Sequence, residues 1–361
     1  MKKSANNKIN VLVLCGGMSP EHVISVVSGA SVASHLDRSK YNVSVVGIGK
    51  EKGEWRYYGE SKFYDDNGTI DSHRLKKSGW QEFVIVPGRG KVFCVVEDNK
   101  LKELDVDVVF PVVHGENCED GTLQGLLEVV GLPTVGCDTL SSAMGMDKDV
   151  TKILSTTSDV QVTPWIYLKN IKDLDETIVQ KKLGFPVFVK PNASGSSFGI
   201  HKVKDKKDLA NAVKDAFKYS EAIIIEKGIN AREIEVAALG KWNGDVKISL
   251  PGEIVPLREF YDYEAKYVDK KGAELIAPTT LDKKTTKLIA QYAENVFRIL
   301  RCSGMARVDF FIDKDSGEVY FNEINTIPGF TVISMYPKLW SETGLSYSAL
   351  LDELIRIGQE R

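Results

Sequence analysis

Residues 306–330, with the sequence ARVDFFIDKDSGEVYFNEINTIPGF, contain two runs of strand-forming residues on either side of a turn. The runs cover Ala306 to Asp313 and Glu318 to Ile324, and the polar segment between them is typical of a hairpin turn. A turn at the middle of that segment would place Asp309 opposite Glu323 across the strand pair. The spacing therefore predicts an antiparallel hairpin with two facing carboxylates.

The hairpin also places other polar side chains on one face. Side chains alternate along a strand, so Arg307 points to the same side as Asp309. On the second strand, Asn325 accompanies Glu323 in the same way. Two carboxylates directly across a strand pair repel each other, and a cation between them would convert that repulsion into a binding site. Oxygen ligands favour Mg²⁺ or Mn²⁺ over zinc, and Arg307 could neutralise a phosphoryl group or an oxyanion.

Two interpretations of the hairpin stay open on these residues alone. The charged residues could simply form a solvated face of an edge hairpin. The tail 325–330, NTIPGF, favours a binding site, because a rigid turn there could aim backbone N–H groups at the same spot.

The residues before the hairpin predict a long helix and a long polar loop. Apolar residues recur at helical spacing between Leu281 and Arg301. Residues 259–278 are polar, rich in tyrosine and lysine, and without periodicity. A loop of that length is typical of a lid or a disordered segment.

A second candidate site surrounds Lys190, at the end of the strand-like run Pro186–Val189. The loop 191–199, PNASGSSFG, has small residues and two glycines that would let backbone N–H groups approach phosphates. The loop lacks the Gly-Lys-Ser/Thr ending of a Walker A motif, so an ordinary surface loop is the alternative. Lys148 and Lys266 are further candidates for phosphate contact, with solvated surface as the alternative for each.

Acidic residues indicate possible binding positions in two other parts of the chain. Glu226 and Glu233 flank a strand–turn–strand segment, where an adenine amino group and a ribose could bind. Glu21 and the pair Glu119-Asp120 stand at helix starts, near His114 at the end of an apolar strand, and together could form an acidic pocket for an ammonium group. The alternatives are acids that only complement helix dipoles and a structural histidine.

The N-terminal third predicts an open, parallel α/β sheet. Ile9–Cys15, Tyr41–Gly49 and Val106–Val113 are strand-like apolar runs. Between the first two, Ser19-Pro20 predicts an N-cap followed by proline in the first helical turn. A strand–helix–strand opening of this kind favours parallel pairing.

The composition is that of an ordinary globular protein of two or three domains. The chain has 361 residues, of which 43% are hydrophobic, and a formal net charge of −3, which gives no reason to expect nucleic acid or an anionic membrane as partner. The polar start MKKSANNKIN predicts no signal peptide, and no window predicts a membrane-spanning helix. Five scattered cysteines without CxxC spacing predict reduced thiols in a cytoplasmic protein.

Seven motifs, taken in order, resemble the D-alanine–D-alanine ligase family of the ATP-grasp superfamily over nearly the whole chain. They are GGMSPE (16–21), His114-Gly115 with EDGTLQG (119–125), MDK (146–148), GSSFG (195–199), YDYEAKY (261–267), ARVD (306–309) and NEINTIPG (322–329). The resemblance implies an N-terminal open parallel-sheet (pre-ATP-grasp) domain over 1–137, followed by a two-lobed ATP-grasp fold. Its central lobe would cover 138–228, and its C-terminal lobe, with the metal site and the lid loop 259–278, would cover 229–361.

The resemblance also implies a role for each motif residue. The ATP phosphates and adenine would be contacted by Lys148, Lys190, Ser197 and Lys266, with Glu226, Lys227, the backbone of Ile229 and Glu233 at the base and ribose. Two Mg²⁺ or Mn²⁺ ions would be held by Asp309, Glu323 and Asn325. The first D-alanine would be bound by Glu21, with His114 nearby. The second D-alanine would be bound by Arg307 and Ser334, with Met335 beside them. Glu21, Ser196 and Tyr267 would fasten the lid, while Arg307 and the Gly329 N–H would stabilise an oxyanion.

The activity that the resemblance implies is ATP-dependent joining of two D-alanines through an acyl phosphate, for peptidoglycan synthesis in the cytoplasm by a homodimer. Two departures from the family pattern, at 116–118 and 22–24, adjoin the first-substrate pocket. The run 136–142, GCDTLSS, resembles vancomycin-resistance relatives, so a D-alanine–D-serine ligase is the alternative, whereas Met335 and the lid motif favour D-alanine. A kinase-like phosphotransferase and a non-catalytic nucleotide-binding paralogue are the competing classes.

Overall fold

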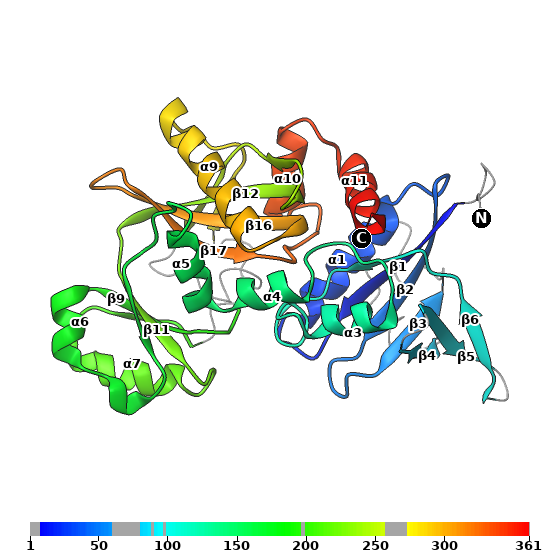
Figure 1. Ribbon diagram of the computed structural model, residues 1–361, viewed down its shortest axis with the longest axis horizontal. Coiled ribbons are helices and arrows are strands. Elements are labelled where there is room, and N and C mark those ends of the chain that lie inside the picture. The colour runs from blue at the N-terminus through cyan, green and yellow to red at the C-terminus, as the bar shows by residue number, and fades with distance from the viewer. Residues whose placement is uncertain are drawn as a thin grey trace.

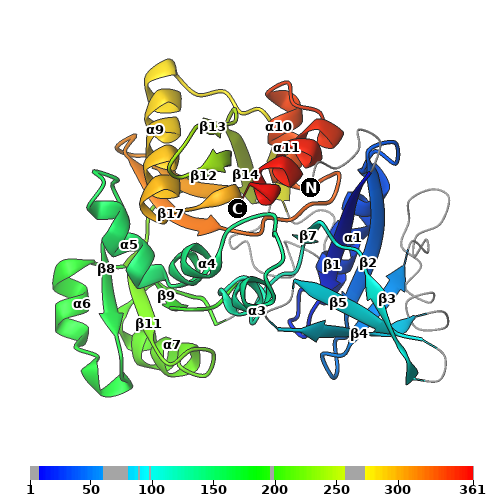
Figure 2. The same cartoon turned by 45° about the vertical axis from the view of Figure 1, so that its right-hand side comes forward.

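The computed structural model describes residues 8–59, 80–87, 90–96, 99–195, 199–256 and 273–360. Within these residues the chain forms three β-sheets, which Figures 1 and 2 show as three bodies around a common centre. The strands of the first sheet come from residues 9–111, those of the second from 165–227, and those of the third from 231–325. The succession of sheets and helices confirms the expected α/β class.

The first sheet has the strand order β6-β5-β4-β3-β2-β1-β7. Its strands are β1 (Ile9–Gly16), β2 (Tyr41–Ile48), β3 (Trp55–Gly59), β4 (Gln81–Val86), β5 (Lys91–Val95), β6 (Leu101–Leu104) and β7 (Val108–Pro111). β1 pairs in parallel with β2 and with β7, as predicted. The remaining described pairs are antiparallel, so the sheet is mixed and the predicted parallel order applies only to its β2-β1-β7 part. β1 is buried from Val11 to Gly16, which suits a strand with neighbours on both sides.

Helix α1 (His22–His35) begins later than predicted. Its N-cap position is Glu21, and no side chain caps the helix. The hydroxyl of Ser19 instead donates to the carbonyl of His114 at 2.6 Å and accepts from the N–H of Glu21 at 3.2 Å. The predicted Ser19 cap is therefore wrong, because this serine ties the turn after β1 to the turn after β7.

Three helices lead from the first sheet to the second: α3 (Thr122–Val130), α4 (Thr139–Met146) and α5 (Lys148–Thr156). Gly131 ends α3 with a positive φ of 84°, which glycine adopts without strain. Asp138 caps α4 by accepting from the N–H of Ser141, and Asp147 caps α5 by accepting from the N–H of Val150. The cap at Asp147 fixes Lys148 as the first residue of α5 and so sets the position from which its side chain extends.

The second sheet has the order β10-β9-β11-β8, and its described pairs are antiparallel. It contains β8 (Trp165–Leu168), β9 (Val187–Pro191), β10 (His201–Val203) and β11 (Ile223–Lys227), with α6 (Glu176–Lys182), α7 (Leu209–Ala216) and the short 3₁₀ turns Ile171–Asp173 and Lys206–Asp208. Val187 and Val189 alternate with Lys190 along β9 and pack in a core with Leu209 and Val213 of α7. Alternation therefore sends Lys190 to the face opposite α7.

The third sheet has the order β15-β14-β12-β16-β17, with β13 beside β12. Its elements are β12 (Ala231–Lys241), β13 (Val246–Ile248), β14 (Gly252–Pro256), β15 (Ala273–Ile276), α9 (Lys283–Ile299), β16 (Ser303–Asp313) and β17 (Val319–Asn325), followed by α10 (Met335–Glu342) and α11 (Tyr347–Gln359). The predicted helix and hairpin are confirmed. The end of the predicted lid is not loop, because residues 273–276 form β15 and pair with β14, while 259–272 lie outside the described residues.

The hairpin register matches the prediction at its functional end. Asp309 lies opposite Glu323, and Arg307 lies opposite Asn325. The register shifts between Asp309 and Phe310, where a β-bulge adds one residue, Asn322, to β17. The apolar face of the same strands packs with α9, so the polar residues occupy the other face.

One hydrophobic core joins the first sheet to the C-terminal helices α10 and α11. Phe330, which is fully buried, meets Phe110 of β7 edge-on with ring centroids 5.8 Å apart and Tyr336 of α10 at 5.5 Å. The Phe330 N–H also donates to Ser28 of α1 at 3.2 Å. The turn after β17 is therefore fixed against the first body. Among the helices of the described segments, none is both long and apolar enough to cross a bilayer.

Candidate active site

Three carboxylates form a row across the polar face of the third sheet. Glu235 of β12 lies opposite Asp309 of β16, which in turn lies opposite Glu323 of β17. Directly opposed residues of neighbouring strands point to the same face, with Cβ atoms about 5 Å apart. Sequence spacing predicted Asp309 and Glu323 but missed Glu235, because the pairing of β12 with β16 is not local.

Arg307 forms ion pairs with two carboxylates of this row, Asp309 and Glu235. Its Nε donates to Oδ1 of Asp309 at 2.8 Å and its Nη2 donates to Oδ2 at 2.7 Å, which is a bidentate pair. Nε also lies 3.2 Å from Oε2 of Glu235. Burial lowers the pKa of the guanidinium, but Asp309 and Glu235 outweigh it and raise the pKa well above its usual range. Among the described residues no group accepts from Nη1, so that end can meet an anionic ligand.

The row suits a divalent cation in both charge and ligand type. Three carboxylates and one guanidinium leave a formal surplus of two negative charges. Asn325 donates through Nδ2 to Asp309 at 3.1 Å, which leaves its carbonyl oxygen as the atom a metal would use. Among the described residues no group of three or more His, Cys, Asp or Glu side chains could hold a metal by itself. An ion on Asp309, Glu323 and Asn325 would therefore draw further ligands from phosphate oxygens and water.

A buried ion cluster on the second sheet faces the hairpin. Glu226, 3% exposed, lies 2.7 Å from Nζ of Lys152 and 2.5 Å from Nζ of Lys190. Burial raises the pKa of Glu226, but the two lysines outweigh it and lower the pKa to about 2. Nζ of Lys190 also lies 3.5 Å from Oδ1 of Asn322, the bulged residue of β17. The two sheets are thus linked through this lysine.

Lys152 was not predicted from the sequence. It is 1% exposed, and its Nζ donates to Oγ1 of Thr163 at 2.7 Å in addition to its contact with Glu226. Burial lowers the pKa of Lys152, partly offset by Glu226. The only local signal was its spacing, four residues after Lys148, which puts both lysines on one side of α5.

Lys148 is held at the start of α5 against the loop after β9. Its Nζ donates to the carbonyl of Ser194 at 2.6 Å, and its N–H donates to the carbonyl of Asn192 at 3.2 Å. Burial lowers its pKa, while Glu323 acts in the opposite direction. Lys148, Lys190 and Glu323 therefore lie within electrostatic reach of one another, as the predicted phosphate and metal roles require.

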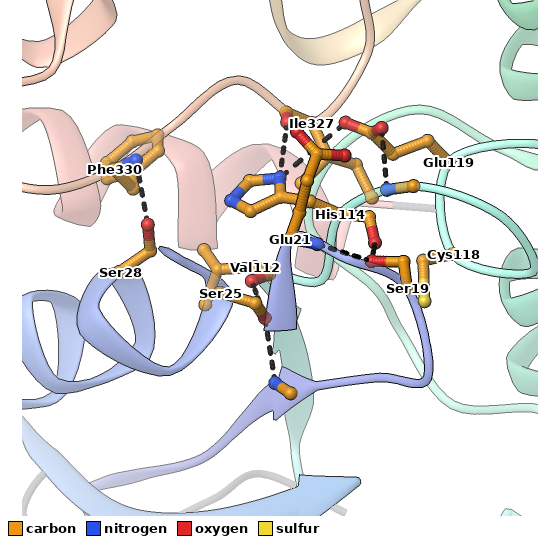
Figure 3. Close-up of polar contacts among 12 residues, drawn as sticks. Ser19, Glu21, Ser25, Ser28, Val112, His114, Cys118, Glu119, Ile327 and Phe330 are labelled. Carbon is orange, nitrogen blue, oxygen red and sulfur yellow. Dashed lines mark hydrogen bonds and ion pairs between the residues drawn. The ribbon is translucent and has the colours of Figure 1, made fainter. Parts of the chain in front are cut away.

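The predicted ammonium pocket also comes together, at the ends of β1 and β7 (Figure 3). Nδ1 of His114 lies 3.1 Å from the carbonyl of Ile327 and 3.6 Å from Oε1 of Glu119. Glu119 accepts from the N–H of Gly115 at 2.8 Å. Burial would lower the pKa of His114, but Glu119 and Glu21 raise it above its usual range. Nε2 of His114 is buried without a hydrogen-bond partner among the described residues, so a ligand could use it.

Glu21 lies between two glycine-containing loops. A Cβ atom on Gly115 would come within 3.2 Å of Oε2 of Glu21, and one on Gly195 within 3.9 Å. Gly115, which has a φ of 83°, therefore allows the turn after β7 to approach Glu21 closely. The same carboxylate lies beside the loop after β9, so the ammonium pocket and the phosphate loop meet at Glu21.

The turn after β17 positions Gly329 beside Ser334. A Cβ on Gly329 would lie 3.0 Å from Oγ of Ser334, and that oxygen accepts from the N–H of Thr331 at 3.0 Å. Met335, the residue after Ser334, is 5% exposed and packs in the core under α10.

The remaining predicted residues divide into two groups. Lys227 is the exposed last residue of β11 in the second sheet, Ile229 lies in the connection, and Glu233 is the third residue of β12 in the third sheet. Ser196, Ser197, Lys266 and Tyr267 lie outside the described residues. The five cysteines are free and buried, as expected for reduced thiols.

Two family models match the chain: the D-ala D-ala ligase N-terminus over residues 10–137 and the D-ala D-ala ligase C-terminus over residues 154–356. The chain belongs to the D-alanine–D-alanine ligase family. A D-alanine--D-alanine ligase of Caldicellulosiruptor bescii is 48% identical, over 98% of this chain and 96% of that protein. One of Clostridium acetobutylicum is 45% identical, over 98% and 99%.

Solved structures of the family match 98% of this chain. The D-alanine-D-alanine ligase from Coxiella burnetii is 38% identical with a TM-score of 0.84, and covers 98% of this chain and 94% of that one. The VanG D-Ala:D-Ser ligase from Enterococcus faecalis is 35% identical with a TM-score of 0.86, over 98% and 100%. These neighbours confirm the expected two-part architecture of an N-terminal sheet domain and an ATP-grasp fold.

Proposed function

We propose that this protein joins two D-alanine molecules into D-alanyl-D-alanine at the expense of ATP. The observation that carries the proposal is the convergence of two sets of groups. Glu323, which lies opposite Asp309 on the hairpin, is within electrostatic reach of Lys148 and Lys190, and the turn after β17 brings Ile327 against His114. A site for phosphoryl transfer and a pocket for an ammonium group thus share one wall.

The chemistry of the substrates explains why both sets are needed. A carboxylate is a poor acyl donor, so its oxygen first attacks the γ-phosphorus of ATP, and the bond from that phosphorus to ADP breaks. The amine of the second D-alanine then attacks the carbonyl carbon of the acyl phosphate. Phosphate leaves with the electrons of the C–O bond, and the amine loses a proton. Each step builds charge that fixed cations and N–H donors can stabilise.

The residues of this chain divide that work between them. Glu21, with His114 and Glu119 nearby, holds the ammonium of the first D-alanine. Lys148 and Lys190 hold phosphate oxygens, while Nη1 of Arg307 and the N–H of Gly329 stabilise the tetrahedral oxyanion. Mg²⁺ or Mn²⁺ held by Asp309, Glu323 and Asn325 would neutralise phosphate charge. Tyr267, Ser196, Ser197 and Lys266 keep their proposed roles in closing the lid and holding ATP.

D-Alanine is the proposed second substrate because the curated relatives named above are D-alanine--D-alanine ligases at 45–48% identity, whereas the D-Ala:D-Ser ligase is 35% identical. The D-serine alternative is therefore not favoured. A cytoplasmic homodimer with the domain limits 1–137, 138–228 and 229–361 is part of the same proposal.

The test measures phosphate release with ATP and Mg²⁺, comparing D-alanine alone with D-alanine plus D-serine or D-lactate, and identifies the products by mass. D-Alanyl-D-alanine from D-alanine alone is the expected result. Turnover only with D-serine or D-lactate would refute the choice of second substrate, and phosphate release without a dipeptide would refute the ligase reaction.

Glu323→Ala gives a matched test of the metal assignment. We expect it to abolish turnover while the fold is kept, because one of the two carboxylate ligands is lost. The exposed Glu318, at the turn end of the hairpin and bonded to Tyr320, provides the control variant Glu318→Ala, which should keep full activity. Unchanged ADP formation in Glu323→Ala would count against the metal site.

A further inference from the structure

Arg307 has one Nε hydrogen and two carboxylates beside that nitrogen. The hydrogen bond goes to Oδ1 of Asp309 at 2.8 Å. Oε2 of Glu235 lies at 3.2 Å from the same nitrogen, as an ion pair. Glu235 is therefore placed to receive this hydrogen whenever Asp309 moves away or loses charge to another partner.

Under the proposed function, Asp309 has to bind both Arg307 and a divalent cation. In the structure both of its oxygens accept from Arg307, and Oδ2 accepts from Asn325 as well. A divalent cation on Asp309 would withdraw electron density from the carboxylate and repel the guanidinium. Without a second anion, no ion pair would then hold the guanidinium of Arg307 in position to contact the reacting groups.

The position of Glu235 suits it to be that second anion. It is 6% exposed, and a carboxylate is buried at a high cost unless a cation accompanies it. On the side of the sheet away from Asp309 it lies opposite Gly252, which contributes no side chain. The next residue of β12 on the same face is Ala237, which lies opposite Arg307 and is too small to displace the arginine side chain.

We propose that Glu235 is a positioning residue that keeps the guanidinium of Arg307 in place while Asp309 binds a divalent cation. The inference rests on the proposed function for the identity of the cation site, and it adds a third carboxylate to the two that bind the metal. Glu235 acts through Arg307, and touches neither substrate nor metal.

The first measurement uses Mn²⁺ alone as the probe and requires no turnover. Free Mn²⁺ is followed by electron paramagnetic resonance during titration of the full-length protein. Glu235→Gln should weaken Mn²⁺ binding about 10-fold, in the range found when a residue that orients a metal ligand is removed. This happens because Arg307 then depends on Asp309 alone and competes with the metal for it.

A double-variant cycle separates this mechanism from a simple loss of negative charge. In an Arg307→Gln background, Glu235→Gln should change Mn²⁺ affinity less than twofold, because the residue through which it acts is gone. An equal loss in both backgrounds, no loss in either, or no Mn²⁺ binding by the parent protein would overturn the proposal. Glu235→Asp, which keeps the charge but withdraws it by one methylene, should lose a few-fold and provides the test if the glutamine variant does not fold.

The matched control removes another buried carboxylate from an arginine pair in the same sheet. Glu253 of β14 accepts from Arg232 at 2.8 and 2.6 Å, away from the carboxylate row. Glu253→Gln should leave Mn²⁺ affinity unchanged, and a loss equal to that of Glu235→Gln would assign the effect to general damage of the sheet.

Kinetics supply the second readout. Glu235→Gln should lower kcat by about 10- to 100-fold with little change in the KM for ATP, because Arg307 acts on the reacting groups rather than on the nucleotide. A rise in KM at constant kcat would contradict this. The Mn²⁺ titration needs neither ATP nor D-alanine, so the two proposals can fail separately. If Glu235→Gln weakens Mn²⁺ binding only when Arg307 is present but the protein makes no dipeptide, the proposed function alone is refuted. If the protein makes the dipeptide but the effect of Glu235→Gln does not depend on Arg307, this inference alone is refuted.

Discussion

Replacing Glu226 by glutamine should destabilise the nucleotide-free protein strongly. The pKa of this carboxyl is lowered from 4.5 to about 2, since Lys152 and Lys190 outweigh the cost of its burial. A difference of that size corresponds to about 3 kcal/mol at neutral pH. Glutamine has a similar shape but no charge, and it would leave the fully buried Lys152 without its anion, which typically costs about 3–5 kcal/mol.

The pH dependence of this effect has a definite sign. A lowered carboxyl pKa contributes stability that is fully present above the unfolded value near 4.5 and is lost as the pH falls toward about 2. The gap between the parent and Glu226→Gln should therefore be largest at neutral pH and shrink by about a quarter at pH 4.

The assay is thermal unfolding without nucleotide at pH 7 and pH 4. For a chain of 361 residues, a loss of about 3 kcal/mol should lower Tm by about 4 °C at pH 7. The second replacement Lys152→Met in the same chain should restore part of that loss, because the unpaired buried cation is then removed. A Tm within about 1 °C of the parent at pH 7, or a double variant less stable than Glu226→Gln, would refute the reasoning.

Two further predictions concern the core and the cysteines. Phe330→Ala should lower stability by about 3–5 kcal/mol, because the ring is fully buried between Phe110 and Tyr336; a loss below about 1 kcal/mol in denaturant unfolding would contradict the packing described. Cys118 should react with iodoacetamide far more slowly than free cysteine at pH 8, since burial raises its pKa to about 12, and mass spectrometry after native and denatured labelling measures this; rapid native labelling would show that the turn after β7 opens readily.

Patterns confined to one strand, helix or hairpin were sufficient for much of the fold. The hairpin followed from its turn and the helix before it from its apolar spacing, but Asp309 faces Glu323 only because the bulge at Asn322 shifts the register that starts at Ile312 and Val319. The predictions that failed involved competition from distant partners. Ser19 does not cap α1 because its hydroxyl bonds the carbonyl of His114, 95 residues away. Residues 273–276 are a strand because β14 offers them a partner.

The site shows the same limit more sharply. A sequence identifies which residue types can bind phosphate or metal, but not which of them neutralise one another. Glu235 shows no local sign of function and Lys152 only its spacing of four residues from Lys148, yet each is almost fully buried and pairs with a predicted site residue of another element. In both cases a predicted ligand-binding group, Glu226 or Arg307, has its charge shared between two partners. A shared charge stays paired when one of its two partners moves away. Under the proposed function, Lys190 and Asp309 therefore turn to their ligands while Lys152 and Glu235 keep Glu226 and Arg307 paired.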